Sequence, residues 1–211
     1  MDSGGTRTNQ CAGLPQRKGR ALFLAFLGAV IAITGASCVF AQDTEQRRNE
    51  KSCRDFVRQF YDWYVPGVGK PHHSGGLFVS DVLRRRPQWF RADLLQMLKK
   101  DSAANEKAGR LGMIDGLDFD PFLNTNGDFG SKAVVQLVRV QDGRCQAEVI
   151  GIEDGKPLGR VEPELVITDA GWKFVNFHYG SQFSKDDNLV AILMQLSDDR
   201  KKEHLKKPTA R

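Results

Sequence analysis

The chain contains 211 residues, of which 40% are hydrophobic and 27% are charged, and its formal net charge is +5. This composition is typical of a globular protein and excludes collagen-like, coiled-coil and multi-pass membrane proteins. The length allows one domain or two small ones, and the 13 phenylalanines provide enough apolar bulk for a hydrophobic core.

The first 41 residues have the pattern of an export signal. Three basic residues lie just before an apolar run from Ala21 to Ala41, and a polar stretch begins at Gln42. This pattern predicts a signal peptide over 1–41 and cleavage near Ala41, which would make the protein periplasmic or secreted. Two alternatives remain open: the run is long enough for an uncleaved membrane anchor, and Cys38 could carry a lipid. After cleavage, no contact with a membrane is expected.

The positive charge is concentrated at the two ends of the chain. Without residues 1–41 there are 27 basic and 25 acidic residues, and removal of 200–211 lowers these counts to 21 and 24. The remaining part is slightly acidic, so we expect no nucleic-acid partner, which would require an excess of basic residues. The basic tail over 198–211 is predicted to be disordered, with contact to anionic lipid or an acidic partner as the alternative.

Cys53 and Cys145 are the cysteines that remain once the signal is removed. Disulfides persist in an exported protein, so these two can form a bond. The bond requires Cα atoms within about 7 Å of each other, a distance that the sequence does not fix. A disulfide is therefore one expectation, and a buried Cys145 with a surface thiol at Cys53 is the other.

Helical patterns dominate the first half of the exported chain. Residues 42–49 are polar and predict a flexible lead-in. Aromatic residues then recur every three or four positions, which predicts an amphipathic helix over 50–64 that ends at Pro66.

A glycine-rich loop containing His72 and His73 separates this helix from the next. No cysteine or third histidine lies near them in sequence, so we expect no metal site there. Helical signals return over 80–100, where Pro87 separates a short helix from a longer one. The arginine triplet 84–86 before that proline predicts a solvated helix end.

Four strand patterns follow, separated by turns that contain glycine. They are preceded by a loop that has neither helical nor strand periodicity, and they are followed by a last amphipathic helix. The loop is predicted over 115–124, the strands over 133–140, 144–153, 158–168 and 172–179, and the helix over 186–196. Helices, then an antiparallel meander, then a helix indicate an α+β domain over 50–197.

The predicted loop contains three aspartates and two nearby asparagines. An EF-hand does not fit, because placing Gly127 at the turn position puts Phe122 at the first ligand position. The favoured interpretation is structural: Asp120 and Asn124 hydrogen-bond to the loop backbone, while apolar residues hold the loop to the core. A looser metal loop is the alternative.

Three segments of the chain resemble a family of exported bacterial domains of unknown function. They are Phe-Val-Arg-Gln-Phe-Tyr-Asp-Trp-Tyr at 56–64, Gly-Leu-Asp-Phe-Asp-Pro-Phe-Leu-Asn at 116–124 and Gly-Trp-Lys-Phe-Val-Asn-Phe-His-Tyr at 171–179. That family is grouped with the nuclear-transport-factor-2-like folds. The resemblance implies a cone, in which N-terminal helices pack on a curved antiparallel sheet of about four strands with a C-terminal helix. By analogy it also implies a possible homodimer.

Within such a cone, we expect an aromatic pocket wall that binds a ligand. The predicted ligand-binding residues are Phe56, Phe60, Tyr61, Tyr64, Trp172, Phe174 and His178. His178, Asp62 and Asp120 are candidate catalytic residues, because a histidine and a carboxylate that meet in a cavity can act as acid and base. In the last strand, His178 is expected on the face opposite Phe177, together with Asn176 and Trp172.

The leading functional hypothesis is an exported, non-enzymatic binding or accessory domain. Its ligand would be a small molecule in an aromatic-lined pocket or a protein on the face of the sheet. We expect no cofactor and no metal. One alternative is a small cofactor-free enzyme of the lyase or isomerase type that uses His178 with a nearby aspartate; the other is a membrane-tethered protein that keeps its N-terminal helix.

Overall fold

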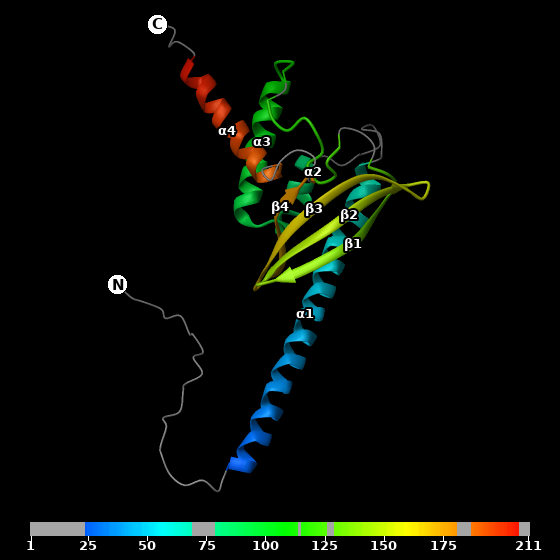
Figure 1. The fold of residues 1–211 in the computed structure, drawn as a ribbon. Coiled ribbons are helices and arrows are strands. Elements are labelled where there is room, and N and C mark those ends of the chain that lie inside the picture. Colours follow the sequence, from blue (N-terminus) through cyan, green and yellow to red (C-terminus); the bar gives the residue numbers. More distant parts are fainter. Residues whose placement is uncertain (1–23, 69–78, 114, 126–128, 181–186, 207–211) are drawn as a thin grey trace, which may run out of the picture. The chain divides into compact units, whose positions relative to one another are not determined.

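The computed structural model describes residues 24–68, 79–113, 115–125, 129–180 and 187–206 (Figure 1). The chain divides into two units, 1–43 and 44–211. In the first unit, the structure describes the beginning of helix α1 from Leu24. The second unit contains the rest of α1 and all the other described elements.

The described helices lie before and after the strands. They are α1 (Leu24–Val68), α2 (Val79–Arg85), the 3₁₀ turn η2 (Pro87–Trp89), α3 (Ala92–Gly109) and α4 (Leu189–Lys206). The predicted division at Pro87 is confirmed, because this proline begins η2 between the short α2 and the longer α3.

The strands form one antiparallel sheet in the order β1-β2-β3-β4. Their bounds are β1 (Lys132–Gln141), β2 (Arg144–Glu153), β3 (Lys156–Thr168) and β4 (Gly171–His178). The first two connections are Asp-Gly pairs, at 142–143 and 154–155, in which both residues have positive φ. This is the tight turn that matches the twist of a hairpin. The predicted α+β class and four-stranded meander are confirmed for the described part of the chain.

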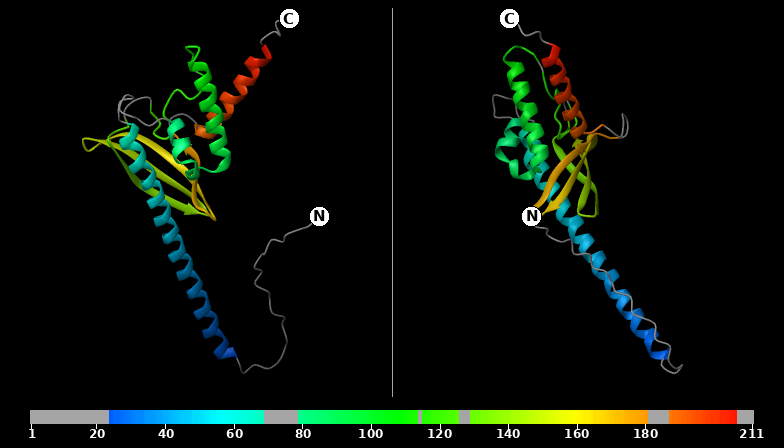
Figure 2. Two further views of the ribbon diagram at one scale, coloured as in Figure 1. Left: turned by 180° about the vertical axis from the view of Figure 1, so that it is seen from behind. Right: turned by 90° about the vertical axis from the view of Figure 1, so that its left-hand side faces the viewer.

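Helix α1 covers one face of the sheet because its buried side chains recur on one side. Figures 1 and 2 show the strands β1 to β3 on one side of α1, in views from the front and from behind. Val57, Phe60, Tyr61 and Tyr64 are at most 1% exposed and face the core. On β2, Cys145 is among the alternate residues that point toward this helix and are buried.

A bulge in β4 changes which face its side chains occupy. Leu165 pairs with Phe174 and Glu164 pairs with Asn176, so Val175 is an extra residue on β4. Trp172 and Phe177 are consequently both buried in the core, although they are five positions apart and an unbroken strand would place them on opposite faces. The prediction that Trp172 shares the face of His178 is therefore wrong, because it assumed an unbroken alternation.

Three predicted boundaries are also wrong, each because a polar segment is helical. Residues 42–49 belong to α1, where the exposed Gln46 bonds to Glu50 one turn later. Helix α3 continues nine residues beyond the predicted end at 100. Helix α4 continues to Lys206, so the tail predicted as disordered from 198 is helical over 198–206.

Helix α4 is longer than predicted because charged side chains in its second half form stabilising contacts. Asp198 and Asp199 pair with Lys201 and Lys202 at three-residue spacing along the helix. Arg200 lies between these pairs and bonds to the buried Asp101 of α3, and its Nε lies 2.7 Å from Asp115 Oδ1. The last turns of α4 are thus tied to α3 and to the loop that follows it.

Candidate functional site

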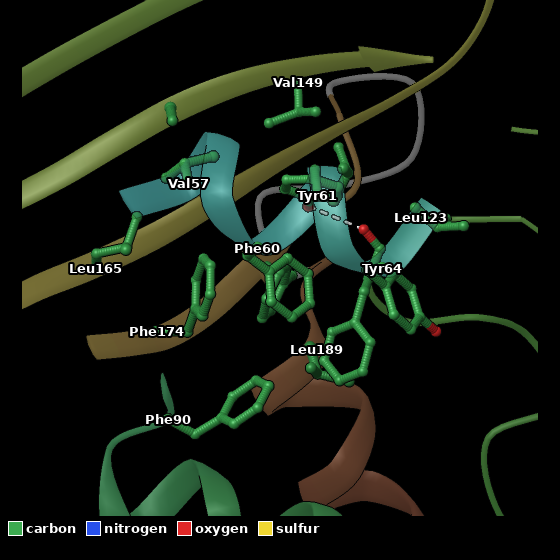
Figure 3. Packing of buried hydrophobic residues seen from close by; sticks show 14 of the residues in the cluster. Val57, Phe60, Tyr61, Tyr64, Phe90, Leu123, Val149, Leu165, Phe174 and Leu189 are labelled. Atoms are coloured by element: carbon green, nitrogen blue, oxygen red, sulfur yellow. Dashed lines mark hydrogen bonds between the residues drawn. The ribbon is translucent and has the colours of Figure 1, made fainter. Parts of the chain in front are cut away.

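The aromatic residues predicted to line a pocket form the centre of the core (Figure 3). Phe60 lies among rings from α1, β4 and the loop after α3, with centroid distances of 4.9 Å to Phe174, 5.4 Å to Tyr64 and 5.6 Å to Phe122. Phe60 and Phe174 are 0% exposed, and Trp172 is 5% exposed. These rings therefore contact one another in the core, whereas the sequence predicted that they would line a pocket and face a ligand.

The loop that begins at Asp120 is held by three tyrosine hydroxyl groups. Tyr64 donates to Oδ2 of Asp120 at 2.7 Å. Tyr179 donates to the carbonyl oxygen of Pro121, and Tyr61 donates to that of Phe122. The chain contains three tyrosines in all, and each binds one of three consecutive loop residues. We call this arrangement the tyrosine latch.

Asp120 also organises the backbone of the latch. Its Oδ1 accepts hydrogen bonds from the backbone N–H groups of Phe122 and Leu123, at 2.9 and 3.1 Å. Desolvation raises the pKa of Asp120 to about 6, although the hydrogen bonds from Tyr64 and the two amides act in the opposite direction. Burial raises the pKa of each latch tyrosine as well.

The structural interpretation of this loop is confirmed for Asp120 and for the apolar residues, whereas the Asn124 side chain bonds to backbone groups outside the loop. Asn124 has a positive φ of 54°, and its side-chain amide donates to the carbonyl oxygens of Arg160 and Tyr179. Phe122 and Leu123 are buried, and the Phe119 ring contacts Tyr179 edge to face. Asparagine and apolar residues thus hold the loop against the sheet.

His178 lies away from both predicted aspartate partners. Its Nε2 is 3.1 Å from Glu164 Oε2 on the neighbouring strand β3, and its side chain is 31% exposed. Asp62 is exposed on α1, whereas Asp120 is partly buried in the latch. The three candidate catalytic residues therefore occupy three different environments, and the expected pairing of His178 with Asp62 or Asp120 is wrong.

The partner of His178 belongs to a charged network on the side of the sheet opposite α1. Glu164 bonds to both His178 and Arg144, and Arg160 bonds to both Glu148 and Glu162. We call this side the outer face, and its polar residues are Arg144, Gln146, Glu148, Arg160, Glu162, Glu164 and His178. The glutamates were not among the predicted site residues, although each alternates with core residues such as Val161 and Leu165 along its strand.

The two cysteines of the domain are bonded. The Cα atoms of Cys53 and Cys145 are 6.6 Å apart, and the bond joins α1 to β2. Both residues are buried in the core cluster. The disulfide therefore fixes the helix against the sheet and closes a loop with a sequence separation of 92 residues.

A second feature that the sequence analysis missed is a corner of two indole rings that holds Arg86. The guanidinium carbon lies 5.4 Å from the Trp63 centroid and 5.3 Å from the Trp89 centroid. The two rings are nearly perpendicular, at 85°. Arg84 and Arg85 are exposed as predicted, but Arg86 is only partly exposed. The three consecutive arginines before Pro87 were noted in the sequence, but nothing in the sequence indicated that the environment of Arg86 differs from that of Arg84 and Arg85.

Comparisons with known protein families, curated proteins and solved structures find no match to this chain. In the part of the chain that the structure describes, no helix has the length and apolarity needed to cross a membrane. His72 and His73 lie outside the described residues, and the side chains of the whole predicted signal peptide are likewise not described.

Proposed function

We propose that this protein is an exported, non-enzymatic binding domain that contacts a partner protein through the outer face of its sheet. The proposal includes the cone fold of the nuclear-transport-factor-2-like proteins, with α1 inside the curve of the sheet. The observation that carries it is the charged network of the outer face, which extends over β2, β3 and β4.

The outer face has the features of a recognition surface. Glu148, Glu162 and Glu164 have side-chain exposures of only 20–22%, because the arginines and His178 lie against them. Ordered charges of both signs give a partner a fixed pattern to match, and such complementarity determines specificity. The aromatic rings, by contrast, contact one another in the core, which favours the sheet over the pocket as the binding surface.

Two further observations support export and the absence of catalysis. The Cys53–Cys145 disulfide is typical of proteins that fold in an oxidising compartment. The enzyme hypothesis paired His178 with an aspartate in a cavity, but His178 lies beside Glu164 on the outer face, and Asp120 is bound by Tyr64 and the loop backbone.

Site-specific photocrosslinking in the producing cell tests the proposal. A photoreactive residue at Gln146, which is exposed on the outer face, should give a discrete adduct of defined mass. The same residue at Lys107, which is exposed on α3, is the matched control and should not give that adduct. An adduct of twice the chain mass would identify the partner as a second copy. Equal labelling at both positions, or none at Gln146, would contradict the proposal.

Two measurements separate the alternatives. The enzyme hypothesis predicts a ligand-dependent turnover that His178→Ala abolishes, while the binding hypothesis predicts only a change in adduct yield. The tether hypothesis predicts that the apolar segment before Gln42 is retained. The mass of the protein recovered from the cell determines this, because a first residue of Gln42 excludes the tether.

A further inference from the structure

We propose that Arg86, Trp63 and Trp89 form a binding site for a carboxylate that is attached to an apolar or aromatic group. This site, which we call the indole corner, lies between α1 and η2 and does not involve the outer face. It therefore does not depend on the proposed function of that face.

The core holds the two tryptophans in place. Trp89 contacts Phe60 and Phe56 at centroid distances of 5.3 and 6.3 Å, and Trp63 contacts Tyr64 at 6.3 Å. Both indoles are only partly buried, so each has one side against the core and another at the surface. Rings that are fixed in this way form a rigid apolar wall, and such aromatic residues are common at the centres of binding surfaces.

Arg86 is fixed by the rings but has no anionic partner. Its guanidinium lies over both indoles, an arrangement that favours a cation. The guanidinium forms no ion pair or hydrogen bond with the residues that the structure describes, whereas those of Arg84 and Arg85 both lie within 4 Å of Asp81.

The hydrogen-bonding state of the guanidinium indicates where a ligand would bind. Nε of Arg86 is buried and has no hydrogen-bond partner. The two terminal nitrogens have no partner either, yet they are not among the buried unpaired atoms of the described chain, so they are accessible. Buried unpaired donors are rare in native proteins, and one that is next to accessible donors of the same group points to a missing ligand.

The geometry selects a carboxylate with an apolar substituent. A planar guanidinium binds carboxylates through paired hydrogen bonds in its own plane, and the terminal nitrogens of Arg86 are the donors of this group that remain accessible. The indole surfaces beside these nitrogens would contact an apolar group attached to the carboxylate. Two kinds of ligand have this chemistry: a small free carboxylic acid with an apolar group, and an acidic side chain next to an aromatic residue in another protein.

Titration of the purified full chain with phenylacetate, followed by tryptophan fluorescence, tests the inference. Two of the three tryptophans of the chain lie in the corner, and the third, Trp172, is 5% exposed. We expect a saturable change with phenylacetate and none with phenylacetamide, which has nearly the same shape but no charge. Arg86→Met should weaken binding about 10- to 100-fold, the effect of losing a charged hydrogen-bonded pair. Arg86→Lys should weaken it less, because lysine keeps the charge but not the paired donors.

Arg85→Met is the matched control and should bind phenylacetate with the affinity of the unaltered protein, since Arg85 points to Asp81. Thermal unfolding of each variant establishes that it is folded. A second titration uses a blocked Asp-Phe dipeptide against its Asn-Phe counterpart, and saturation in this titration alone would identify a protein side chain as the ligand. No saturation with either carboxylate, an equal response to the uncharged compounds, or an equal loss in Arg85→Met would overturn the inference.

Discussion

Replacing Asp120 by asparagine should remove a pH dependence of stability that arises from one carboxyl group. Desolvation raises the pKa of Asp120 from 3.8 to about 6 in the folded protein. Between these two values the folded state holds a proton that the unfolded chain has released, so stability decreases as the pH rises through this window. The contribution is fully present below 3.8 and is lost above about 6. Because one pKa unit corresponds to about 1.4 kcal/mol, the loss at neutral pH is about 3 kcal/mol.

Asparagine is suited to this test because it keeps the hydrogen bonds of the latch. Oδ1 of Asp120 accepts from two backbone amides, and the carbonyl oxygen of an asparagine can accept the same two bonds. The side-chain NH₂ group would then donate to the Tyr64 hydroxyl oxygen, which lies 2.7 Å from Oδ2 of Asp120 in the wild type. The substitution therefore removes the titration, and although the Tyr64 hydroxyl hydrogen loses its acceptor, that cost does not vary with pH in this range.

Urea unfolding at a series of pH values measures the effect. The free energy of unfolding of Asp120→Asn relative to wild type should increase by about 2.4 kcal/mol between pH ~4 and pH ~7, most of the full difference. Asp118→Asn is the control, because Asp118 lies in the same loop but is exposed, and its difference from wild type should not vary with pH. A difference that stays constant for Asp120→Asn, or that varies equally in the control, would refute the reasoning.

Three other changes test the contacts that hold the domain together. Replacing the two bonded cysteines by serine should lower the free energy of unfolding by about 4 kcal/mol, and a reductant should then have no further effect on urea unfolding. Arg200→Met should cost about 3 kcal/mol in the same assay, because Asp101 stays buried without its partner, and adding Asp101→Asn should recover part of the loss. Gly151→Ala should give little folded protein by circular dichroism, since its Cβ would overlap a backbone carbonyl oxygen, whereas Gly109→Ala, which meets nothing within 4 Å, should fold.

The elements that the sequence predicted correctly are those with local signals. The hairpin turns at 142–143 and 154–155 are Asp-Gly pairs, and this dipeptide adopts the required positive φ at both positions. The role of Asp120 in the loop after α3 was also interpretable, because an aspartate side chain binds backbone groups two or three residues away. These signals do not depend on distant parts of the chain.

The features that the sequence did not predict depend on distant contacts. The helical state of 198–206 is supported by Arg200, whose partner Asp101 lies 99 residues away in sequence. No residue type in the sequence marks the bulge at Val175. The bulge nevertheless places Trp172 on the face of the sheet opposite to the predicted one. Arg86 differs from the two arginines before it because it contacts Trp63 and Trp89. The sequence shows only three identical consecutive residues and does not indicate which of them makes these contacts.

The tyrosine latch gives the protein an internal optical reporter. All three tyrosines bind the same loop, and burial raises the pKa of each well above the ordinary value of 10.0. Ionised tyrosine absorbs ultraviolet light at longer wavelengths than the neutral form. In mildly alkaline solution, absorbance from tyrosinate would therefore arise from molecules in which this loop has opened. The opening of one segment can thus be followed in the unmodified chain, without an added label.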